Sequence, residues 1–396
     1  MTILNKTKFI TSLFLLLFIT HFTFADFIID NDFDFSLDIP EGYELSDVSE
    51  DAMTLMFTHP NIPVTFFIRI YDKSHEFKTS EDALKETLNK LSATYETSVF
   101  NWSNEECTLS PFKTNLNVQN GTVYSGWSVS APLKDESNIV LICYAPEQEA
   151  DKCQDFMIST INSLCIKSDY YNIPGIITTF AYPSEGKTDF TVKIANKNIL
   201  SHLDKSDSTA AQFVIDMEYR ILNYYGQHNL WMKAWQRYYR MIFRDSYGRL
   251  EDFSQKVLDS VYMAALKKRS DNPDIQFAQY ILSWVQTFPY VRATEKSQSD
   301  FSNIPSVLQG AASDCDNRSL LVCILLEYAD IDSMLLISPV FGHAMAATDI
   351  EAPGQTFINP ENEREYIVGE TTADVTWGMM AREQADKNKW FTVTFP

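Results

Sequence analysis

The chain has 396 residues, 45% of them hydrophobic, with 32 basic against 53 acidic side chains and a formal charge of −21. Such a charge repels phosphate backbones and anionic lipid surfaces, which argues against nucleic acid as a partner. The length exceeds one ordinary hydrophobic core and predicts two globular domains.

Residues 1–25 have the composition of a signal peptide. Two lysines precede an apolar run from Phe9 to about Phe22, and Thr23-Phe24-Ala25 places small residues before a cleavage site. The run is shorter than the ~20 apolar residues of a membrane span, and no later stretch approaches that length. We therefore expect an exported chain, periplasmic or extracellular, that begins at Asp26 and has no stable membrane span. Loss of the two lysines takes its formal charge from −21 to −23.

Residues 26–168 are expected to form an N-terminal α+β domain. Apolar and polar residues alternate as in strands of an antiparallel sheet over residues 33–39, 53–57, 64–71, 123–130 and 139–144. Ser80 can cap one helix, and a second is predicted from about Lys152 to Leu164. The order of these elements weakly resembles that of PsbP-like domains, and we carry no functional residue over from that resemblance.

Four of the six cysteines, Cys107, Cys143, Cys153 and Cys165, fall in this domain. An exported chain permits disulfides. If Cys153 and Cys165 bound the same helix they lie roughly 18 Å apart, too far to pair with each other. The favoured pairing is then Cys107 with Cys165 and Cys143 with Cys153. The exchanged pairing, Cys107 with Cys153 and Cys143 with Cys165, and a set of reduced, buried thiols stay open.

Residues 166–174 form the predicted linker to a second α+β domain over residues 175–396. A small strand pair is expected around residues 188–194, followed by helices over residues 207–268. Aromatic residues recur there at helical spacing between Trp231 and Phe243, and we interpret them as core packing of the domain. Histidines elsewhere in the chain have no cysteine or carboxylate at ligand spacing, so we expect no metal site and no cofactor.

The next feature is a cysteine at a predicted helix start. Small and polar residues end at Asp314, a good N-cap, and the apolar run Leu320 to Leu326 follows. A helix N-terminus favours an anion, so the thiol of Cys315 should ionise more readily there and act as a nucleophile. The alternative is that Cys315 is a small buried hydrophobe, as we expect for Cys323 in the same helix.

One histidine follows Cys315 in the chain, His343, on a predicted strand entered through a glycine. A cysteine nucleophile and a histidine base need a third group that orients the imidazole. Asp349 lies on the same strand, but the extended chain places it roughly 20 Å away. Glu370, on the next predicted strand, can lie about 5 Å across from His343. We therefore predict Cys315, His343 and Glu370 as the catalytic residues.

These residues, with the sequence from Val285 to Tyr290, resemble the transglutaminase-like superfamily, closest to its prokaryotic, cysteine protease-like members. The resemblance covers roughly Gln276 to Thr372. It implies Cys315 as nucleophile, His343 as base and Glu370 in the place usually held by Asp. Ser313 stands where a glycine is common, and Asn317 where an acid is common.

The resemblance also implies a function. In related cysteine enzymes a Gln or Trp before the nucleophile helps to stabilise the oxyanion, which makes Gln286 a candidate, with a solvent-facing helix residue as the equal alternative. We expect acyl transfer from a peptide, protein or cell-wall amide through a thioester, with hydrolysis favoured over cross-linking. The alternative is an exported, inactive binding or scaffold protein that keeps the fold. The sequence does not indicate an oligomeric state.

Overall fold

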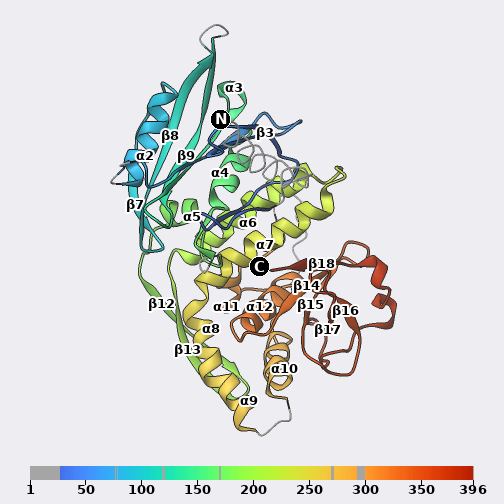
Figure 1. Ribbon diagram of the computed structural model, residues 1–396. Helices are drawn as coiled ribbons and strands as arrows, with labels where there is room; N and C mark the ends of the chain where they lie inside the picture. Colours follow the sequence, from blue (N-terminus) through green and yellow to red (C-terminus); the bar gives the residue numbers. More distant parts are fainter. Residues whose placement is uncertain are drawn as a thin grey trace, which may run out of the picture. The chain divides into compact units, whose positions relative to one another are not determined.

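The computed structural model describes residues 27–75, 77, 79–117, 121–168, 171–268, 272–291 and 299–395 (Figure 1). The chain divides between Ser168 and Asp169 into two compact units. Both mix helices with antiparallel sheets, as the sequence predicts. The predicted signal peptide lies outside the described residues.

Unit 1 contains two sheets. The smaller has the order β1-β2-β11, formed by β1 (Phe27–Asp30), β2 (Phe35–Asp38) and β11 (Cys165–Ile166). The larger has the order β3-β4-β5-β10-β9-β8-β6, with β7 paired to β8. Its strands are β3 (Glu44–Val48), β4 (Thr54–Thr58), β5 (Thr65–Tyr71), β6 (Thr94–Tyr95), β7 (Ser98–Trp102), β8 (Glu105–Asn117), β9 (Thr122–Pro132) and β10 (Asn138–Pro146). Every pair in both sheets is antiparallel.

Helix α2 (Ser80–Lys90) packs on the larger sheet, which α3 (Glu147–Ala150) and α4 (Gln154–Asn162) also contact. Leu84 and Leu88 of α2 join Val140 and Ile142 of β10 in one core cluster. Successive strand residues point to opposite faces, and almost all of β10 is buried, so both faces of this strand are covered. A hydrogen bond of 2.9 Å between the Tyr71 and Thr87 hydroxyls ties β5 to α2.

Three predictions for unit 1 need correction. Residues 33–39 contribute β2 to the smaller sheet and not to the sheet that holds the other predicted strands. The predicted linker begins with Ile166, which is still paired to β2. Neither disulfide pairing forms, because all six cysteines are buried thiols outside any disulfide, so the third alternative holds.

Unit 2 begins with a helix and a two-stranded sheet and continues as a set of helices. The elements are α5 (Ile176–Ala181), β12 (Lys187–Ile194), β13 (Lys197–Asp204), α6 (Asp207–Tyr224), α7 (Trp231–Arg249), α8 (Glu251–Val257), the π-helix η2 (Leu258–Tyr262), α9 (Met263–Lys267), α10 (Pro273–Val285), α11 (Ile304–Leu308) and α12 (Cys315–Glu327). The aromatic stripe lies on α7, where Tyr238, Tyr239 and Phe243 are buried, as core packing requires.

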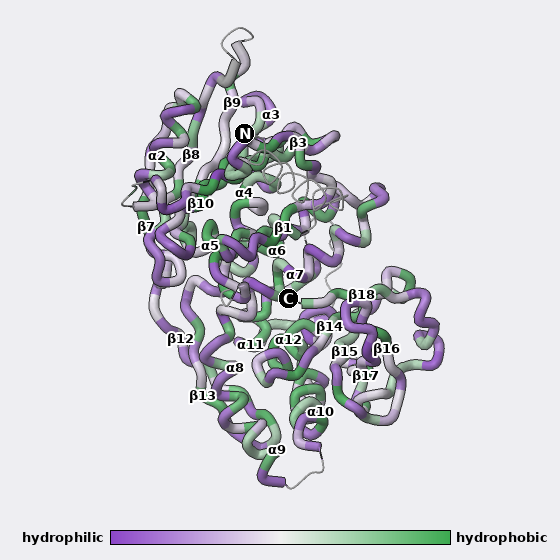
Figure 2. The backbone as a smooth tube through the Cα atoms, viewed as in Figure 1, coloured by the Kyte–Doolittle hydropathy of each residue, from purple (hydrophilic) through white to green (hydrophobic). Residues whose placement is uncertain are grey.

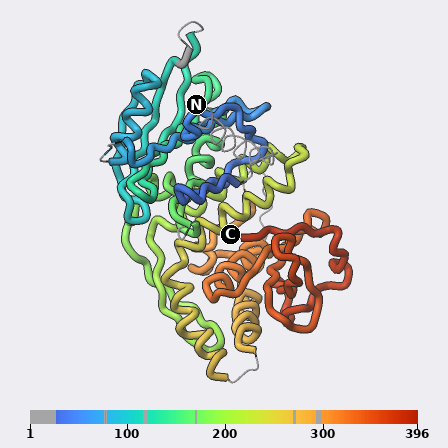
Figure 3. The backbone as a smooth tube through the Cα atoms, viewed as in Figure 1, coloured from blue at the N-terminus to red at the C-terminus, as the bar shows by residue number. Residues whose placement is uncertain are grey.

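A five-stranded antiparallel sheet follows, in the order β16-β17-β15-β14-β18. Its strands are β14 (Ser333–Ser338), β15 (His343–Thr348), β16 (Thr356–Ile358), β17 (Glu365–Gly369) and β18 (Phe391–Thr394), with the short helices η3 (Arg382–Gln384) and η4 (Lys387–Lys389) before the last strand. Figure 3 traces β18 at the red end of the chain beside β14. Helix α12 contacts β14 and β15, and its apolar run Leu320 to Leu326, green in Figure 2, is buried.

The helix predicted over Gln276 to Tyr290 is shifted in the structure. It begins earlier, at Pro273, and ends at Val285. Pro289 disfavours helical backbone in the residue before it, and Tyr290 instead forms a parallel bridge with Ser313. Within the described part of the chain, no helix is both long and apolar enough to cross a membrane.

Candidate functional site

Cys315 is the first residue of α12, so its thiol lies at the N-terminus of a helix. The Oδ1 atom of the N-cap Asp314 accepts hydrogen bonds from the N–H groups of Asp316 (3.1 Å) and Asn317 (3.3 Å). Asn317 completes a capping box, because its Oδ1 accepts the N–H of Asp314 at 2.9 Å. The predicted helix start is confirmed, and the cap fixes the backbone around the cysteine.

The Cys315 side chain is enclosed, since only 1% of the residue is exposed. Its Sγ donates a hydrogen bond to Asp316 Oδ1 at 3.1 Å, and the hydroxyl of Tyr239 on α7 donates to the other oxygen of that carboxylate at 2.6 Å. The backbone N–H of Ala344 is directed at the sulfur and favours its thiolate. The sulfur therefore lies against β15, the strand that begins at His343.

Burial raises the pKa of the Cys315 thiol well above its usual range, and the carboxylates of Asp316 and Asp314 add to the increase. Two acids this close also affect each other: burial and the charge of Asp316 raise the pKa of Asp314 to about 7. The sequence-based expectation of a lowered thiol pKa is therefore wrong for this conformation. The helix N-terminus does favour an anion, but burial and adjacent negative charge outweigh it.

His343 and Glu370 form a close pair in the same unit. His343 begins β15, and Glu370 directly follows β17, the antiparallel neighbour of β15. The imidazole Nε2 lies 2.7 Å from Glu370 Oε2, and the two side chains are 11% and 7% exposed. Thr372 secures the other oxygen, Oε1, through its N–H at 2.7 Å and its hydroxyl at 2.6 Å.

The charge of Glu370 is stabilised in place. Burial alone would raise the pKa of this carboxyl group, but the contacts with His343 and Thr372 outweigh burial and hold its pKa below the ordinary 4.5. An ionised Glu370 accepts the N–H at Nε2, so Nδ1 is the ring nitrogen left for another partner. Ala344 follows His343 directly, its N–H lowers the pKa of the Cys315 thiol, and α12 contacts β15, so the structure places the cysteine beside the strand that begins with the histidine.

Asp349, the competing carboxylate, lies elsewhere. It follows the end of β15 and pairs with the guanidinium of Arg364. Its backbone N–H donates to the carbonyl of Asp332 at 2.9 Å, which fixes it at the far end of the strand from His343. The choice of Glu370 over Asp349 as the partner of the histidine agrees with this geometry.

Gln286 supports the segment that carries Glu370. It is the C-cap residue of α10, and its Nε2 donates to the carbonyl oxygens of Glu370 (2.8 Å) and Val375 (3.0 Å). Both N–H groups of the amide are thus used to hold the segment that carries Glu370. Its Oε1 is buried and has no hydrogen-bond partner among the described residues. In this conformation the side chain supports the site through Glu370 and leaves no amide N–H for an oxyanion.

Arg318 is a supporting residue that the sequence reasoning missed. It is 1% exposed, on α12, one turn after the cysteine. Its guanidinium donates to the Ser313 hydroxyl (3.0 Å) and to the carbonyl oxygens of Thr371 (3.1 Å) and Phe288 (2.7 Å). One buried cation thereby ties together the segments before Cys315, after Glu370 and after α10. An arginine two residues before the apolar helical run was the available signal.

Among the described residues, no group of three or more His, Cys, Asp or Glu side chains is placed to hold a metal ion. His59, His75, His202 and His228 lie apart from the site and from one another in the chain.

Comparison with known proteins adds three distant likenesses. No family model and no curated protein matches the chain. Part of the chain weakly resembles PsbP from Synechocystis sp. PCC 6803, with a TM-score of 0.29, 11% identity, and 35% of this chain and 91% of that one covered. A crystal structure from Bacteroides thetaiotaomicron VPI-5482 aligns with a TM-score of 0.25 and 12% identity over 57% of this chain and 77% of the other.

The third structure is a Pseudomonas aeruginosa protein of unknown function described as a putative regulator. It aligns with a TM-score of 0.21 and 13% identity over 30% of this chain and 81% of its own. TM-scores this low assign neither a fold family nor an activity. The functional argument therefore rests on the side chains of the site.

Proposed function

We propose that this chain is an exported cysteine enzyme of the transglutaminase-like type that hydrolyses a peptide or amide bond through a thioester on Cys315. The observation that carries the proposal is the buried pair of His343 Nε2 and Glu370 Oε2 at 2.7 Å, on a strand whose next N–H faces the Cys315 sulfur. A nucleophile, a base and an orienting carboxylate are the three groups that such chemistry needs.

The reaction proceeds in two displacements. His343 Nδ1 takes the thiol proton, the sulfur attacks the carbonyl carbon, and Glu370 stabilises the imidazolium. The C–N bond then breaks, and the imidazolium gives its proton to the leaving amine. Water, deprotonated by His343, attacks the thioester; the acid is released and the thiol is restored. Peptides, proteins and cell-wall amides are the substrates that an exported enzyme of this type would meet.

The resting thiol must first leave its hydrogen bond with Asp316. In that bond the thiol is the proton donor. The raised pKa of the thiol likewise favours its protonated form. A substrate that displaces the Asp316 carboxylate from the sulfur would remove the negative charge that opposes ionisation and free the thiol for the imidazole. Exchange of the thiol partner from Asp316 to His343 is therefore part of the proposed mechanism.

Alkylation of Cys315 by iodoacetamide at neutral pH tests this proposal. Cys323 is a matched control, because it lies on the same helix, is 0% exposed and donates to a carbonyl 3.5 Å away. We expect Cys315 to react faster than Cys323, to slow at least tenfold in His343→Ala, and to accelerate in Asp316→Asn. Peptide mapping by mass spectrometry separates the two sites.

A second candidate function is an inactive binding or scaffold protein. The observations in its favour are the burial of Cys315 and the two carboxylates that suppress its ionisation. Equal and slow labelling of Cys315 in the wild type and in His343→Ala would favour this function over catalysis, because an unassisted thiol does not respond to loss of the base.

A further inference from the structure

A pocket of about 500 Å³ opens beside the histidine in unit 2. Phe341, Val375, Met379 and Met380 give it an apolar lining, and Met379 is 53% exposed at its mouth. The volume lies within the range of pockets that bind small molecules and single side chains. The aromatic ring and the two thioethers form a surface suited to an apolar group.

Specific hydrogen bonds and packing contacts fix the wall of the pocket. The backbone N–H of Gly378 donates to the carbonyl of Val368 at 2.7 Å. This bond fixes the loop that follows Glu370 to strand β17. Trp377 packs so closely on Gly369 that a Cβ atom at this glycine would lie 2.6 Å from its ring. Gln286 braces the same loop from α10. These contacts fix the position of the pocket wall.

A polar atom in the wall also lacks a protein partner. Gln384 lines the pocket, and its Oε1 is buried with no hydrogen-bond partner among the described residues. A buried acceptor left unsatisfied costs free energy. Glu370, also in the wall, adds a negative charge that disfavours an acidic ligand.

The residues that line the pocket indicate which part of a substrate it binds. They include His343 and Glu370, whereas Cys315 is enclosed and is not among them. In a thiol–imidazole reaction the acyl group goes to the sulfur, and the amine leaves with the proton of the imidazolium. The amine side of the bond therefore lies against the imidazole, where this pocket begins.

We propose that this pocket binds the first residue on the amine side of the cleaved bond and selects a long aliphatic or aromatic side chain there. The proposal rests on the function proposed above and deepens it by naming the substrate class. Discrimination of one methylene group in an apolar pocket is worth roughly 10–200-fold. We expect kcat/KM for leucine or phenylalanine at this position to exceed that for glycine by at least tenfold, and aspartate to be excluded.

The test uses quenched fluorescent peptides that differ only in the residue after the cleaved bond. Met379→Lys places a cation at the pocket mouth and should shift the preference from leucine towards aspartate by at least tenfold. Met263→Lys is the matched control, because this methionine on α9 is 44% exposed and does not line the pocket. An unchanged preference in an active Met379→Lys protein would overturn the proposal.

A second experiment measures ligand binding in a variant that cannot cleave peptides. In the Cys315→Ala protein with methyl-labelled methionines, leucinamide should shift the Met379 and Met380 methyl resonances, and glycinamide should not. If no peptide is cleaved but leucinamide still shifts these resonances, the pocket assignment stands and the proposed activity fails. If peptides are cleaved and leucinamide shifts neither methyl group, the activity stands and the pocket assignment fails. If neither happens, both are wrong.

Discussion

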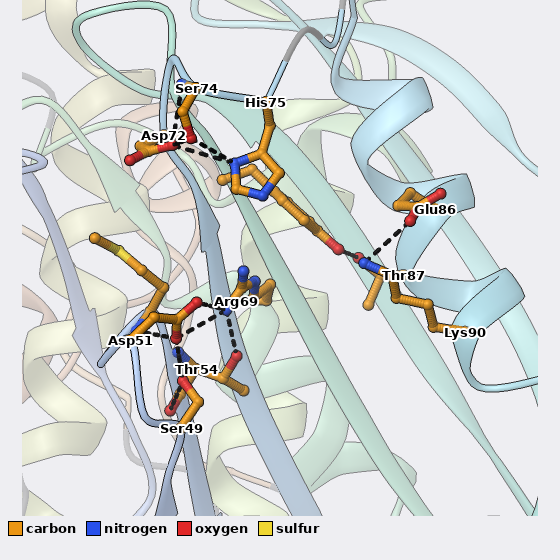
Figure 4. A network of polar contacts seen from close by, with 12 residues as sticks. Ser49, Asp51, Thr54, Arg69, Asp72, Ser74, His75, Glu86, Thr87 and Lys90 are labelled. Carbon is orange, nitrogen blue, oxygen red and sulfur yellow. Dashed lines mark hydrogen bonds and ion pairs between the residues drawn. The ribbon is translucent and has the colours of Figure 1, made fainter.

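Two of the histidine–carboxylate pairs in the described residues, one taken from each unit, have the same chemistry and different surroundings. In unit 1, His75 Nδ1 lies 3.1 Å from Asp72 Oδ1, three residues earlier in the same turn, with 38% and 39% of the side chains exposed (Figure 4). In unit 2, His343 and Glu370 come from different strands and are 11% and 7% exposed. A local turn makes the first pair, whereas the folded sheet makes the second.

The comparison shows that a short distance between a histidine and a carboxylate does not by itself indicate a functional pair. Ser74 and His75 lower the pKa of Asp72, but water reaches this carboxylate and screens its charge, so little depends on the contact. Glu370 keeps its charge although it is buried, because His343 and Thr372 compensate for lost water. A buried charge held by several partners is a feature of sites where charge is used.

The largest expected effect comes from removing the charge of the buried pair. Glu370→Gln keeps the shape but no longer stabilises the imidazolium, so kcat/KM should fall by about 10³–10⁴-fold, as in other triads that lose the carboxylate. Asp72→Asn is the control and should change kcat/KM less than twofold. Steady-state hydrolysis of one peptide by both variants checks this. Equal effects of the two substitutions would mean that Glu370 has no catalytic role.

A smaller effect is expected on the pH dependence of stability. The folded pKa of Glu370 is lowered, so its stabilising contribution is present above the ordinary value of 4.5 and is lost as pH falls through the folded value. The melting temperature of the wild type should therefore fall more steeply between about pH 5 and pH 3 than that of Glu370→Gln. Buried acids with raised pKa values, such as Glu327, are common to both proteins and cancel in the difference.

Asp72→Asn again serves as the comparison. Water screens its carboxylate, so the lowered pKa is worth little stability, and we expect its melting curve to run nearly parallel to the wild type over the same pH range. Parallel curves for Glu370→Gln as well would show that the paired carboxylate does not contribute to acid stability, and that the lowered pKa does not hold in solution.

Parts of the site could be predicted because their causes are local. The start of α12 follows from Asp314 and the apolar run, both adjacent in the chain. The antiparallel pairing of β15 with β17 was predicted from two strands and the turn-rich segment between them, in which the structure also forms β16. The choice of Glu370 over Asp349 needed only the length of an extended chain.

Other features depend on contacts that the sequence does not display. Asp316 is adjacent to Cys315, but its hydrogen bond from Tyr239 spans 77 positions, and the burial that raises the thiol pKa comes from elements far apart in the chain. Gln286 and Arg318 hold their segments mainly through carbonyl oxygens, which every residue possesses, so the sequence does not show which segments they join. Strand β8 was missed because Pro111 interrupts a half-polar stretch.

The smallest expected effect tests the identity of the third catalytic group. Asp349→Asn should leave kcat/KM within twofold of the wild type, since its carboxylate pairs with Arg364 at the other end of β15. Arg364 is 56% exposed, so loss of the ion pair should lower the free energy of unfolding by less than about 1 kcal/mol. Urea denaturation and peptide hydrolysis measure the two quantities. If Asp349→Asn abolished hydrolysis while Glu370→Gln preserved it, the imidazole would take its orientation from Asp349, and the pairing of β15 with β17 could not persist in the active protein.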